Sequence, residues 1–536
     1  MSFLQTELDN SRDRKSVETL IRVWDGNWNL LGTLSGDYKH EFTFLNNDAG
    51  AATVELPLDH WMAETLMDPQ KWPTKSLYLT FDKDGARWSG RIETMKVIVD
   101  YKGDQQLELY ALHDYAKLRE LLVWANPFLP AEVQFPKAWM LFGPSRWAVT
   151  ATLFVNLLRK NNSLWMIPDD PLNFRQWFDL DMSNWSMVVK PVDFGSDTSL
   201  TSVVYSRFKT FHDCVAPILA DAQLTIDCRR YLSGDPDPIP GKRLRYGCLV
   251  FDVKDQSGWN KQTSFGGNTR QGLSRAIKRI KSEDGLVEGL DTLPRVDFPA
   301  EYSAKEKAGS LPSAPWVVLE HGRYTGVEAT EFEYSPPGPS QFVTGGSSMP
   351  GVNEAIKASI IGFGGLLGTF IGFQSQLGSV ADALLEPLYS DVFMAFMAHK
   401  HRDRIQEQGW DYPFEQWVDG SDQAYTLNAV STLRRAKHDT RERFAATVKM
   451  NNGSPYWVGP AGFGDFFVGD RVAVHALGMP KDQLYVEQVQ ELTYRSSPDE
   501  RDWEISIGKP EFASGIEFVQ NRLEHLTSSL REQGVW

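Results

Sequence analysis

Apolar and polar residues alternate in short runs near the start of the chain, and turn residues separate these runs. Ile21–Trp24 is followed by Asp25-Gly26 and then by Leu30–Leu34, a pattern typical of a β-hairpin. The same alternation predicts a meander of about three strands, at Leu77–Phe81, Arg87–Tyr101 and Gln106–Tyr110. A β-domain therefore begins near Ile21.

Three similar runs occur near the other end of the chain, at Arg471–His475, Leu484–Tyr494 and Trp503–Ile507. In the middle run of each set, Gly90–Glu93 aligns with Glu487–Gln490. The alignment predicts a weak internal repeat. A true duplication and the generic pattern of a β-meander explain it about equally well.

The chain between these β-regions mixes helical and extended patterns. The spacing of apolar residues predicts helices at Ala148–Leu158 and Phe208–Ala222. Alternation predicts strands at Leu224–Cys228 and Leu249–Val253, which together with the second helix indicate an α+β module. A mainly helical segment is expected from Asn353 to about Ala446.

Tryptophan is concentrated between the first β-region and this module. We interpret these side chains as core and interface residues in preference to a surface that binds sugar rings. The six residues are Trp124, Trp139, Trp147, Trp165, Trp177 and Trp185.

Length and charge narrow the range of functions. A chain of 536 residues is too long for one ordinary domain and predicts three or four. It carries 55 Lys and Arg against 70 Asp and Glu, a net charge of -15, which argues against a protein that mainly binds a phosphate backbone. Cys214, Cys228 and Cys248 have no zinc-site spacing and are expected to be buried thiols. Met1–Leu20 has no apolar stretch, so no secretory signal is expected.

Local signatures of catalysis are incomplete in this chain. The turn Gly143-Pro144-Ser145-Arg146-Trp147 has a serine in the position of a nucleophile elbow but lacks the final glycine, so Ser145 is interpreted as a turn residue. His212-Asp213-Cys214 places three reactive types side by side, where they cannot form a relay. His399 and His401, two positions apart, are predicted to lie on different faces of a solvated helix end. No catalytic residue, metal ligand or cofactor is therefore expected.

A run of 24 residues without a formal charge, Ala358–Ala381, contains six glycines. Gly364, Gly368 and Gly372 are spaced by four, which places them on one side of a helix and lets another backbone approach closely. A helix of this length would span about 36 Å at about 1.5 Å per residue, long enough for a membrane. We favour protein–protein packing over membrane insertion. The candidate helix-packing or membrane-active residues are these three glycines with Phe363, Leu367, Phe370 and Ile371.

A further set of segments shares its order with a known family. The segments are Val23–Gly32, Leu121–Pro127, Val133–Pro136 with Phe142–Pro144, Phe251–Gly258, Val343–Gly346 and Gly459–Asp470. From about Ile21 to Pro510 the chain resembles the minor tail proteins of actinobacterial siphophages, the Gp37-like family, which look like tail hub or baseplate hub proteins. The family supplies no catalytic residues to transfer.

The resemblance implies a β-rich α+β fold with two related β-barrel domains and with α+β and helical insertions. It implies a homotrimer whose six barrels join the sixfold tail tube to a threefold tip and line or close the DNA exit channel. The implied partners are the tail tube, distal tail, tape-measure and other tip proteins, without specific nucleic-acid binding. The resemblance leaves open whether the protein contacts the host membrane. The implied location is the distal end of the tail in the virion, after synthesis in the host cytoplasm.

Together, pattern and resemblance predict seven regions. They are an N-terminal arm (1–20), a first β-barrel hub domain (21–120), a Trp-rich, partly helical insertion (121–198), an α+β module with a loop-rich end (199–350), a helical segment with the glycine run (351–446), a second β-barrel hub domain (447–512) and a C-terminal helix or tail (513–536).

Two other functions explain single segments. A tail-associated hydrolase of cell-wall glycan would use the Trp-rich region to hold its substrate and two carboxylates to cut it. A membrane-active DNA-delivery protein would act through the segment around Gly364, Gly368 and Gly372. The hub interpretation is preferred because it uses the whole chain.

Overall fold

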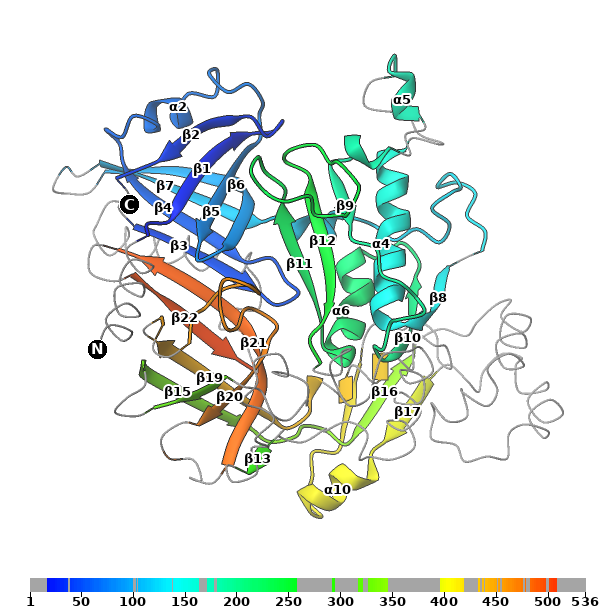
Figure 1. Ribbon diagram of the computed structural model, residues 1–536. Helices are drawn as coiled ribbons and strands as arrows, with labels where there is room; N and C mark the ends of the chain where they lie inside the picture. Colours follow the sequence, from blue (N-terminus) through cyan, green and yellow to red (C-terminus); the bar gives the residue numbers. More distant parts are fainter. Residues whose placement is uncertain are drawn as a thin grey trace.

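Fourteen strands form one sheet in the computed structural model of the protein. The structure describes residues 17–36, 39–99, 103, 105–136, 138–162, 171–177, 181–257, 292–294, 317–321, 326–345, 396–418, 432–433, 436–437, 439–450, 452–453, 456–475, 478, 483–497 and 501–508. The sheet consists of two halves, drawn in blue and in orange to green in Figure 1, which we call the N-terminal and the C-terminal β-unit.

The N-terminal β-unit has the strand order β2-β1-β5-β6-β7-β4-β3, with every neighbouring pair antiparallel. A short helix, α2 (Ala63–Met67), follows β4. The predicted hairpin and three-stranded meander are both present. The strands are β1 (Leu20–Asp25), β2 (Leu30–Leu34), β3 (Lys39–Leu45), β4 (Ala51–Pro57), β5 (Leu77–Lys83), β6 (Ala86–Val99) and β7 (Gln105–His113).

The C-terminal β-unit has the order β15-β19-β22-β21-β20, again antiparallel, with β14 parallel to β20 and β13 beside β21. Every second side chain of β19 is buried, as expected for a strand with one face on a core. The strands are β13 (Thr292–Pro294), β14 (Val318–Glu320), β15 (Val327–Ser335), β19 (Arg443–Met450), β20 (Arg471–His475), β21 (Gln483–Ser496) and β22 (Arg501–Ile507).

The two β-units repeat one five-stranded arrangement, because β3-β4-β7-β6-β5 and β15-β19-β22-β21-β20 have the same order and directions. The middle strands, β6 and β21, are both 14 residues long. Each has a bulge, where Glu93 is the extra residue between Ile92 and Thr94, and Gln490 is the extra residue between Val489 and Glu491. The predicted alignment of Gly90–Glu93 with Glu487–Gln490 superimposes these two bulges. A shared bulge favours duplication over a generic meander.

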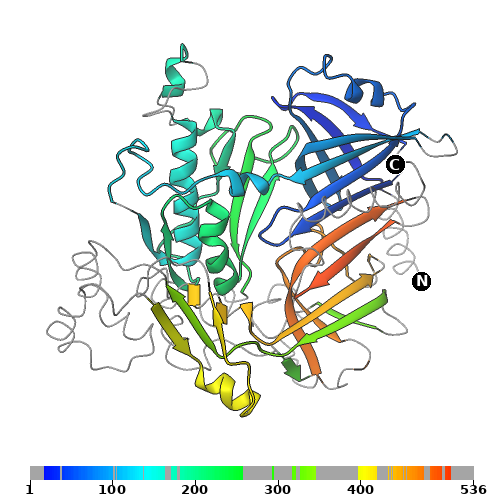
Figure 2. The same ribbon diagram turned by 180° about the vertical axis from the view of Figure 1, so that it is seen from behind.

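A central α/β unit packs beside both β-units (Figure 2). Helix α4 (Ser145–Asn161) and helix α6 (Phe211–Ala222) cover two small sheets, β8-β10 and β11-β12-β9. Thr210 accepts a hydrogen bond from the backbone N–H of Asp213 and caps α6. The other elements are α3 (Ala116–Glu120), β8 (Trp139–Pro144), α5 (Phe174–Trp177), η1 (Met182–Asn184), β9 (Met187–Val189), β10 (Thr201–Ser206), β11 (Leu224–Arg230) and β12 (Leu249–Asp255).

The predicted boundary near residue 198 does not separate two modules in the structure. Strands β8 and β9 precede it, yet they pair with β10 and β12, which follow it. One hydrophobic core holds side chains from both sides of the boundary, including Leu153 and Phe251. Long-range strand pairing, which local patterns do not reveal, makes the two predicted regions one unit.

The segment predicted to be mainly helical, 351–446, contains strands in its described part. A small sheet places β16 (Gln341–Gly345) between β17 (Phe396–Lys400) and β18 (Glu415–Trp417). Helix α10 (Arg402–Gln408) follows β17, and β19 begins before residue 446. The helical prediction is wrong for the strands, whereas α10 is helical as expected; strand pairing, with β16 for β17 and β18 and with β15 and β22 for β19, overrides the local spacing.

The predicted second hub domain, 447–512, is only part of the C-terminal β-unit, which also recruits β13, β14 and β15 from before residue 350. Among the described strands, β15 and β2 stand at the two ends of the strand order and do not pair with each other. The sheet continues without a break from one β-unit to the other. Residues 1–16 of the predicted arm and the whole of 513–536 lie outside the described residues.

Candidate functional site

The junction between the two β-units is a pair of antiparallel strands, β3 and β21, which we call the seam. It extends from the pair Leu45–Glu491 to the pair His40–Ser496. In its middle, the hydroxyl oxygens of Thr43 and Thr493 are 2.9 Å apart. The seam uses only the second half of β21, after the bulge, because the first half pairs with β20.

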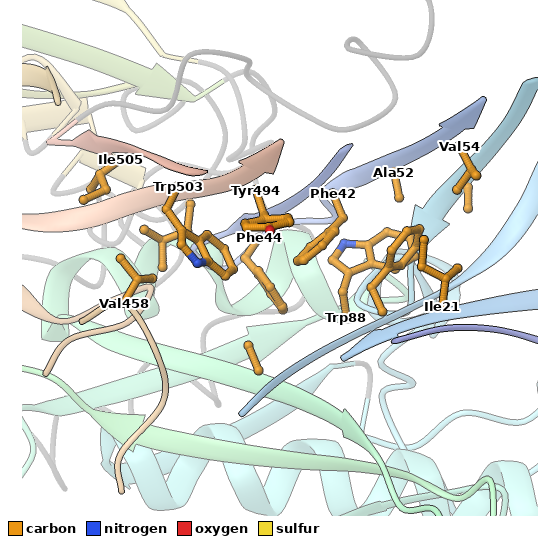
Figure 3. Close-up of a cluster of buried hydrophobic side chains, with 14 of the residues drawn as sticks. Ile21, Phe42, Phe44, Ala52, Val54, Trp88, Val458, Tyr494, Trp503 and Ile505 are labelled. Atoms are coloured by element: carbon orange, nitrogen blue, oxygen red, sulfur yellow. The ribbon is translucent and has the colours of Figure 1, made fainter. Parts of the chain in front are cut away.

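Aromatic side chains continue from one β-unit to the other behind the seam (Figure 3). The ring of Phe42 lies 5.3 Å from that of Tyr494 and 5.7 Å from that of Trp503, centroid to centroid. The indole Nε1 of Trp503 donates to the Asp84 carboxylate across the junction at 3.1 Å. One hydrophobic core therefore spans both β-units, and burial of aromatic surface stabilises their association.

The loop after β3 connects three parts of the molecule. The backbone N–H of Asn46 donates to the bulge carbonyl of Gln490 at 2.8 Å. The side chain of Asn47 donates to the Leu224 carbonyl at 2.7 Å and accepts from the N–H of Ile226 at 2.9 Å, so it occupies the edge of β11 like a neighbouring strand. Asn47 has a φ of 57°, a conformation that asparagine tolerates better than most residues.

A buried ion pair joins the central α/β unit to the N-terminal β-unit. Arg230, at the end of β11, donates two hydrogen bonds of 2.8 and 2.7 Å to Asp114, just after β7, and its guanidinium lies over the ring of Trp28. Burial opposes ionisation of Asp114, but the charge and hydrogen bonds of Arg230 outweigh it and lower the pKa of the carboxyl to about 2. Ser89 donates a third hydrogen bond to the same carboxylate.

Among the residues that the structure describes, fewer polar groups connect the central unit to the C-terminal β-unit than to the N-terminal one. Arg471, at the start of β20, donates to the side chain of Gln223 at 3.1 Å. Asp470 accepts a hydrogen bond from the N–H of Phe467, yet burial dominates and raises the pKa of its carboxyl to about 6. The pKa of the buried carboxyl is thus lowered at the junction with the N-terminal β-unit, where Asp114 lies, and raised at the junction with the C-terminal β-unit, where Asp470 lies.

The serine and the cysteines singled out in the sequence have structural roles. Ser145 is buried at the start of α4 and donates to the carbonyl of Leu200. Cys214, Cys228 and Cys248 are buried free thiols, as predicted. His212 contacts the hydroxyl of Tyr115 through Nδ1, so it faces away from a relay with Cys214, whose sulfur lies 3.3 Å from the Tyr205 carbonyl.

The prediction for the histidine pair is wrong. His399 lies in β17 and His401 directly follows it, so the extended backbone places both on one side, with ring centroids 4.4 Å apart. Burial and nearby positive charge lower the pKa of His401 to about 2. Within the described ranges, no three His, Cys, Asp or Glu side chains are grouped so that they could share a metal ion.

Tryptophans of the central unit mostly pack inside it. Trp185 is buried, Trp139 donates to the Thr152 hydroxyl at 3.0 Å, and Trp147 packs edge-on against Phe194. Trp177 is more exposed, and Trp165 lies outside the described residues. These contacts support the interpretation of the tryptophans as packing residues.

The glycine run lies outside the described residues, with Phe363, Gly364, Leu367, Gly368, Phe370, Ile371 and Gly372. Its attachment points are described: Gly345, the last residue of β16, is the strand partner of Phe396, the first residue of β17. Among the helices that the structure describes, none is long and apolar enough to span a membrane. The role of the run stays a prediction.

Sequence comparison identifies the family. The model of the Siphovirus ReqiPepy6 Gp37-like protein family matches residues 20–509. The chain belongs to this Gp37-like family. The minor tail proteins Gp28 of Mycobacterium phage L5 and of Mycobacterium phage D29 are each 36% identical to it, over 96% of this chain and 94% of the relative. The resemblance seen in the sequence is thereby confirmed.

Solved structures of tail proteins also align with this Gp37-like chain. The 43 kDa tail protein of prophage MuSo2 from Shewanella oneidensis aligns with 92% of this chain and 99% of its own, at 11% identity and a TM-score of 0.41. The tail protein from Neisseria meningitidis MC58 aligns with 94% of this chain and 99% of its own, at 10% identity and a TM-score of 0.40.

The residues that organise the junctions of this Gp37-like protein were not among the sequence candidates. Asn46-Asn47-Asp48 is a turn signal directly after an apolar run, so the loop itself was visible in the sequence. Its partners on β11 and β21 are far away in the chain, and nothing local reports them. The same is true of Asp114 and Arg230.

Proposed function

We propose that this Gp37-like protein is a structural component of a siphophage tail tip: a homotrimeric hub that joins the sixfold tail tube to the threefold tip. The observation that supports this proposal best is the repeated five-stranded arrangement, joined into one sheet by the seam. Three chains with two similar β-units each present six similar surfaces around an axis. Minor tail proteins of mycobacteriophages are its relatives over nearly the whole chain.

On this proposal each β-unit is one barrel-like segment of the ring, and the ring lines or closes the DNA exit channel. Its partners are the tail tube, the distal tail, the tape-measure and other tip proteins. The net charge of -15 suits a channel wall, because acidic surfaces repel a passing phosphate backbone. The role is structural and needs no catalytic centre.

The copy number and symmetry of the protein in purified particles test the hub proposal. We expect three copies per particle in a closed ring at the distal end of the tail, seen by imaging of the tip and by quantification against the tube protein. A single copy, or six identical subunits in a sixfold ring, would refute the hub. Lytic activity of the purified protein on actinobacterial cell wall, lost on substitution of an acidic residue, would favour a hydrolase.

We further propose that residues 346–395, which include Gly364, Gly368 and Gly372, act at the ring axis as a plug or during DNA delivery. They are inserted between β16 and β17, whose ends are strand partners, so a short turn can replace them without moving the small sheet. Particles with this replacement are expected to assemble normally and to fail in DNA delivery. Unchanged infectivity would contradict the proposal.

A further inference from the structure

Two strand edges, one in each β-unit, have no described strand beside them. Strand β6 pairs with β5 up to Arg91, so beyond the bulge only its β7 side is occupied among the described strands. Strand β15 pairs with β19 on one side, and no described strand lies on its other side. Six strands lie between β15 and β6 in the strand order. The two strands belong to different β-units (Figure 1). An open edge is a template for pairing with another chain.

The equivalent edges are joined inside the chain by the seam. Strand β6 corresponds to β21, because their bulges superimpose, and β15 corresponds to β3, because each is the first strand of the repeated arrangement. In the seam, β3 occupies the edge of β21 beyond the bulge. By the same geometry, a copy of β15 fits the edge of β6 beyond its bulge.

The repeat also fixes a register. Following the strand pairs through each unit, Tyr494 corresponds to Val97, and Phe42 corresponds to Phe332. The seam pair Tyr494–Phe42 therefore becomes Val97 opposite Phe332. The neighbouring pairs become Lys96 opposite Glu333 and Met95 opposite Tyr334.

These pairs are chemically complementary. Val97 and Phe332 are 38% and 39% exposed and lie outside the shared core, and pairing would cover both. Lys96 and Glu333 have opposite charge, in the place where the seam has Thr493 and Thr43. Directly opposed residues of an antiparallel pair share one face, so each match occurs on one side of the sheet.

We propose that β15 of one copy pairs antiparallel with residues 94–99 of β6 in a neighbouring copy, in the register Lys96–Glu333 and Val97–Phe332. The proposal rests on the homotrimeric hub. It makes the contact between chains a repetition of the contact within a chain. Because the two edges differ, the interface is head-to-tail, and such interfaces close into rings when the rotation permits.

Disulfide trapping in assembled particles tests the register. Opposed residues in antiparallel strands have Cα atoms about 4.5 or 5.5 Å apart, and both distances suit a disulfide. The variants Lys96→Cys with Glu333→Cys, and Val97→Cys with Phe332→Cys, are expected to give covalent ladders of up to three chains after mild oxidation. The native thiols do not interfere, because burial raises the pKa of Cys214 and of Cys248 to about 12 and that of Cys228 well above its usual value.

The matched control is Lys96→Cys with Glu331→Cys, which keeps the same face but shifts the register by two residues. It is expected to yield at least ten-fold less ladder. A ring of three copies in which the shifted pair traps better, or in which neither matched pair traps, overturns the edge contact and leaves the hub intact. Particles without three copies refute the hub itself, whatever the cross-links show.

Charge reversal gives an independent readout. Lys96→Glu and Glu333→Lys, each alone, place like charges opposite each other at the interface, and each is expected to lower incorporation into particles at least ten-fold. The double variant restores the opposite charges and is expected to recover incorporation to within about three-fold of the unsubstituted chain. Failure of the double variant to recover, with the purified single variants still folded, contradicts the proposed register.

Discussion

The two β-units have the same five-stranded arrangement but different neighbours. In the N-terminal unit, β5 is followed at the edge by antiparallel β1, whereas in the C-terminal unit β20 is followed by parallel β14. The N-terminal unit is tied to the central α/β unit by the Asp114–Arg230 ion pair and by Asn47, while the C-terminal unit contributes Arg471 and a carboxyl with a raised pKa, that of Asp470. A duplicated scaffold thus diverges mainly in its attachments.

These contacts differ in how strongly they hold the three units together. The central unit is held chiefly by the N-terminal unit, and the C-terminal unit is held chiefly by the seam and the shared core. Substitutions in the two attachments should therefore have unequal effects on stability.

The largest effect is expected for Arg230→Met. The substitution leaves Asp114 buried without its counter-charge, and loss of one partner of a buried pair costs about 3–5 kcal/mol. The free energy of unfolding in urea measures it. The matched variant Arg471→Met, which removes the hydrogen bond to Gln223, is expected to cost about 1 kcal/mol.

A double variant distinguishes lost charge pairing from lost packing. Asp114→Leu with Arg230→Met removes both charges and keeps apolar volume, so it is expected to recover much of the stability lost in Arg230→Met. If Arg471→Met proves as costly as Arg230→Met, the central unit is anchored to both β-units equally.

The next largest effect is expected for Asn47→Ala. It removes one hydrogen bond to Leu224 and one from Ile226, and it places alanine at a φ of 57°, so we expect a loss of about 2 kcal/mol. Asn47→Gly is the control, because glycine adopts this φ freely and isolates the side-chain contribution. Thermal unfolding curves that are equal for Asn47→Gly and the unsubstituted chain would show that the Asn47 side chain does not stabilise the attachment.

Local patterns in the sequence predicted the strands of the meanders and aligned the two segments in which the structure places the bulges. Alternation has a short range, and Gly90–Glu93 and Glu487–Gln490 both lie in single continuous strands. Helices α4 and α6 were predicted for the same reason.

Contacts between distant segments were outside the reach of these patterns. The seam joins residues about 450 positions apart, and β15 reaches β19 across more than 100 residues. Strand β17 was missed because its pairing with β16 decides its conformation, and the error placed His399 and His401 on different faces. Family resemblance, by contrast, was readable from ordered short segments and was confirmed over residues 20–509.

A smaller effect, with opposite signs in the two units, is expected on changing the pH. Asp114 has a lowered pKa in the folded state, so its contribution to stability is complete above its usual value near pH 4 and is lost as the pH falls toward 2. Asp470 has a raised pKa, so folding is favoured as its carboxyl is protonated on going below pH 6. Asp470→Asn should therefore stabilise the protein at pH 8 by on the order of 1 kcal/mol, stabilise it less at pH 5, and have little effect only below about pH 4, where the carboxyl is protonated in both the folded and the unfolded chain.

Denaturant unfolding at pH 8 and pH 5 measures this difference between the two units. Asp114→Asn is the companion variant and should be destabilising at both pH values, because the charge of Arg230 is then buried without a partner. A stabilising effect of Asp470→Asn that is the same at both pH values would show that the carboxyl does not titrate between them.

The smallest effect is expected at the rim of the seam. Arg495 lies 3.3 Å from Glu41 across β21 and β3 and also pairs with Glu504 of β22, but its side chain is 39% exposed, so solvent screens both ion pairs. Arg495→Ala should cost less than about 1 kcal/mol, and the loss should shrink further at high salt. If Arg495→Ala instead separates the two β-units, seen as two unfolding transitions in place of one, the seam depends on charge. The shared aromatic core would then form only because the ion pair holds the two units together. The edge contact proposed between chains would need an ion pair at the equivalent position, where Ile98 lies opposite Glu331 and the sequence provides no positive charge.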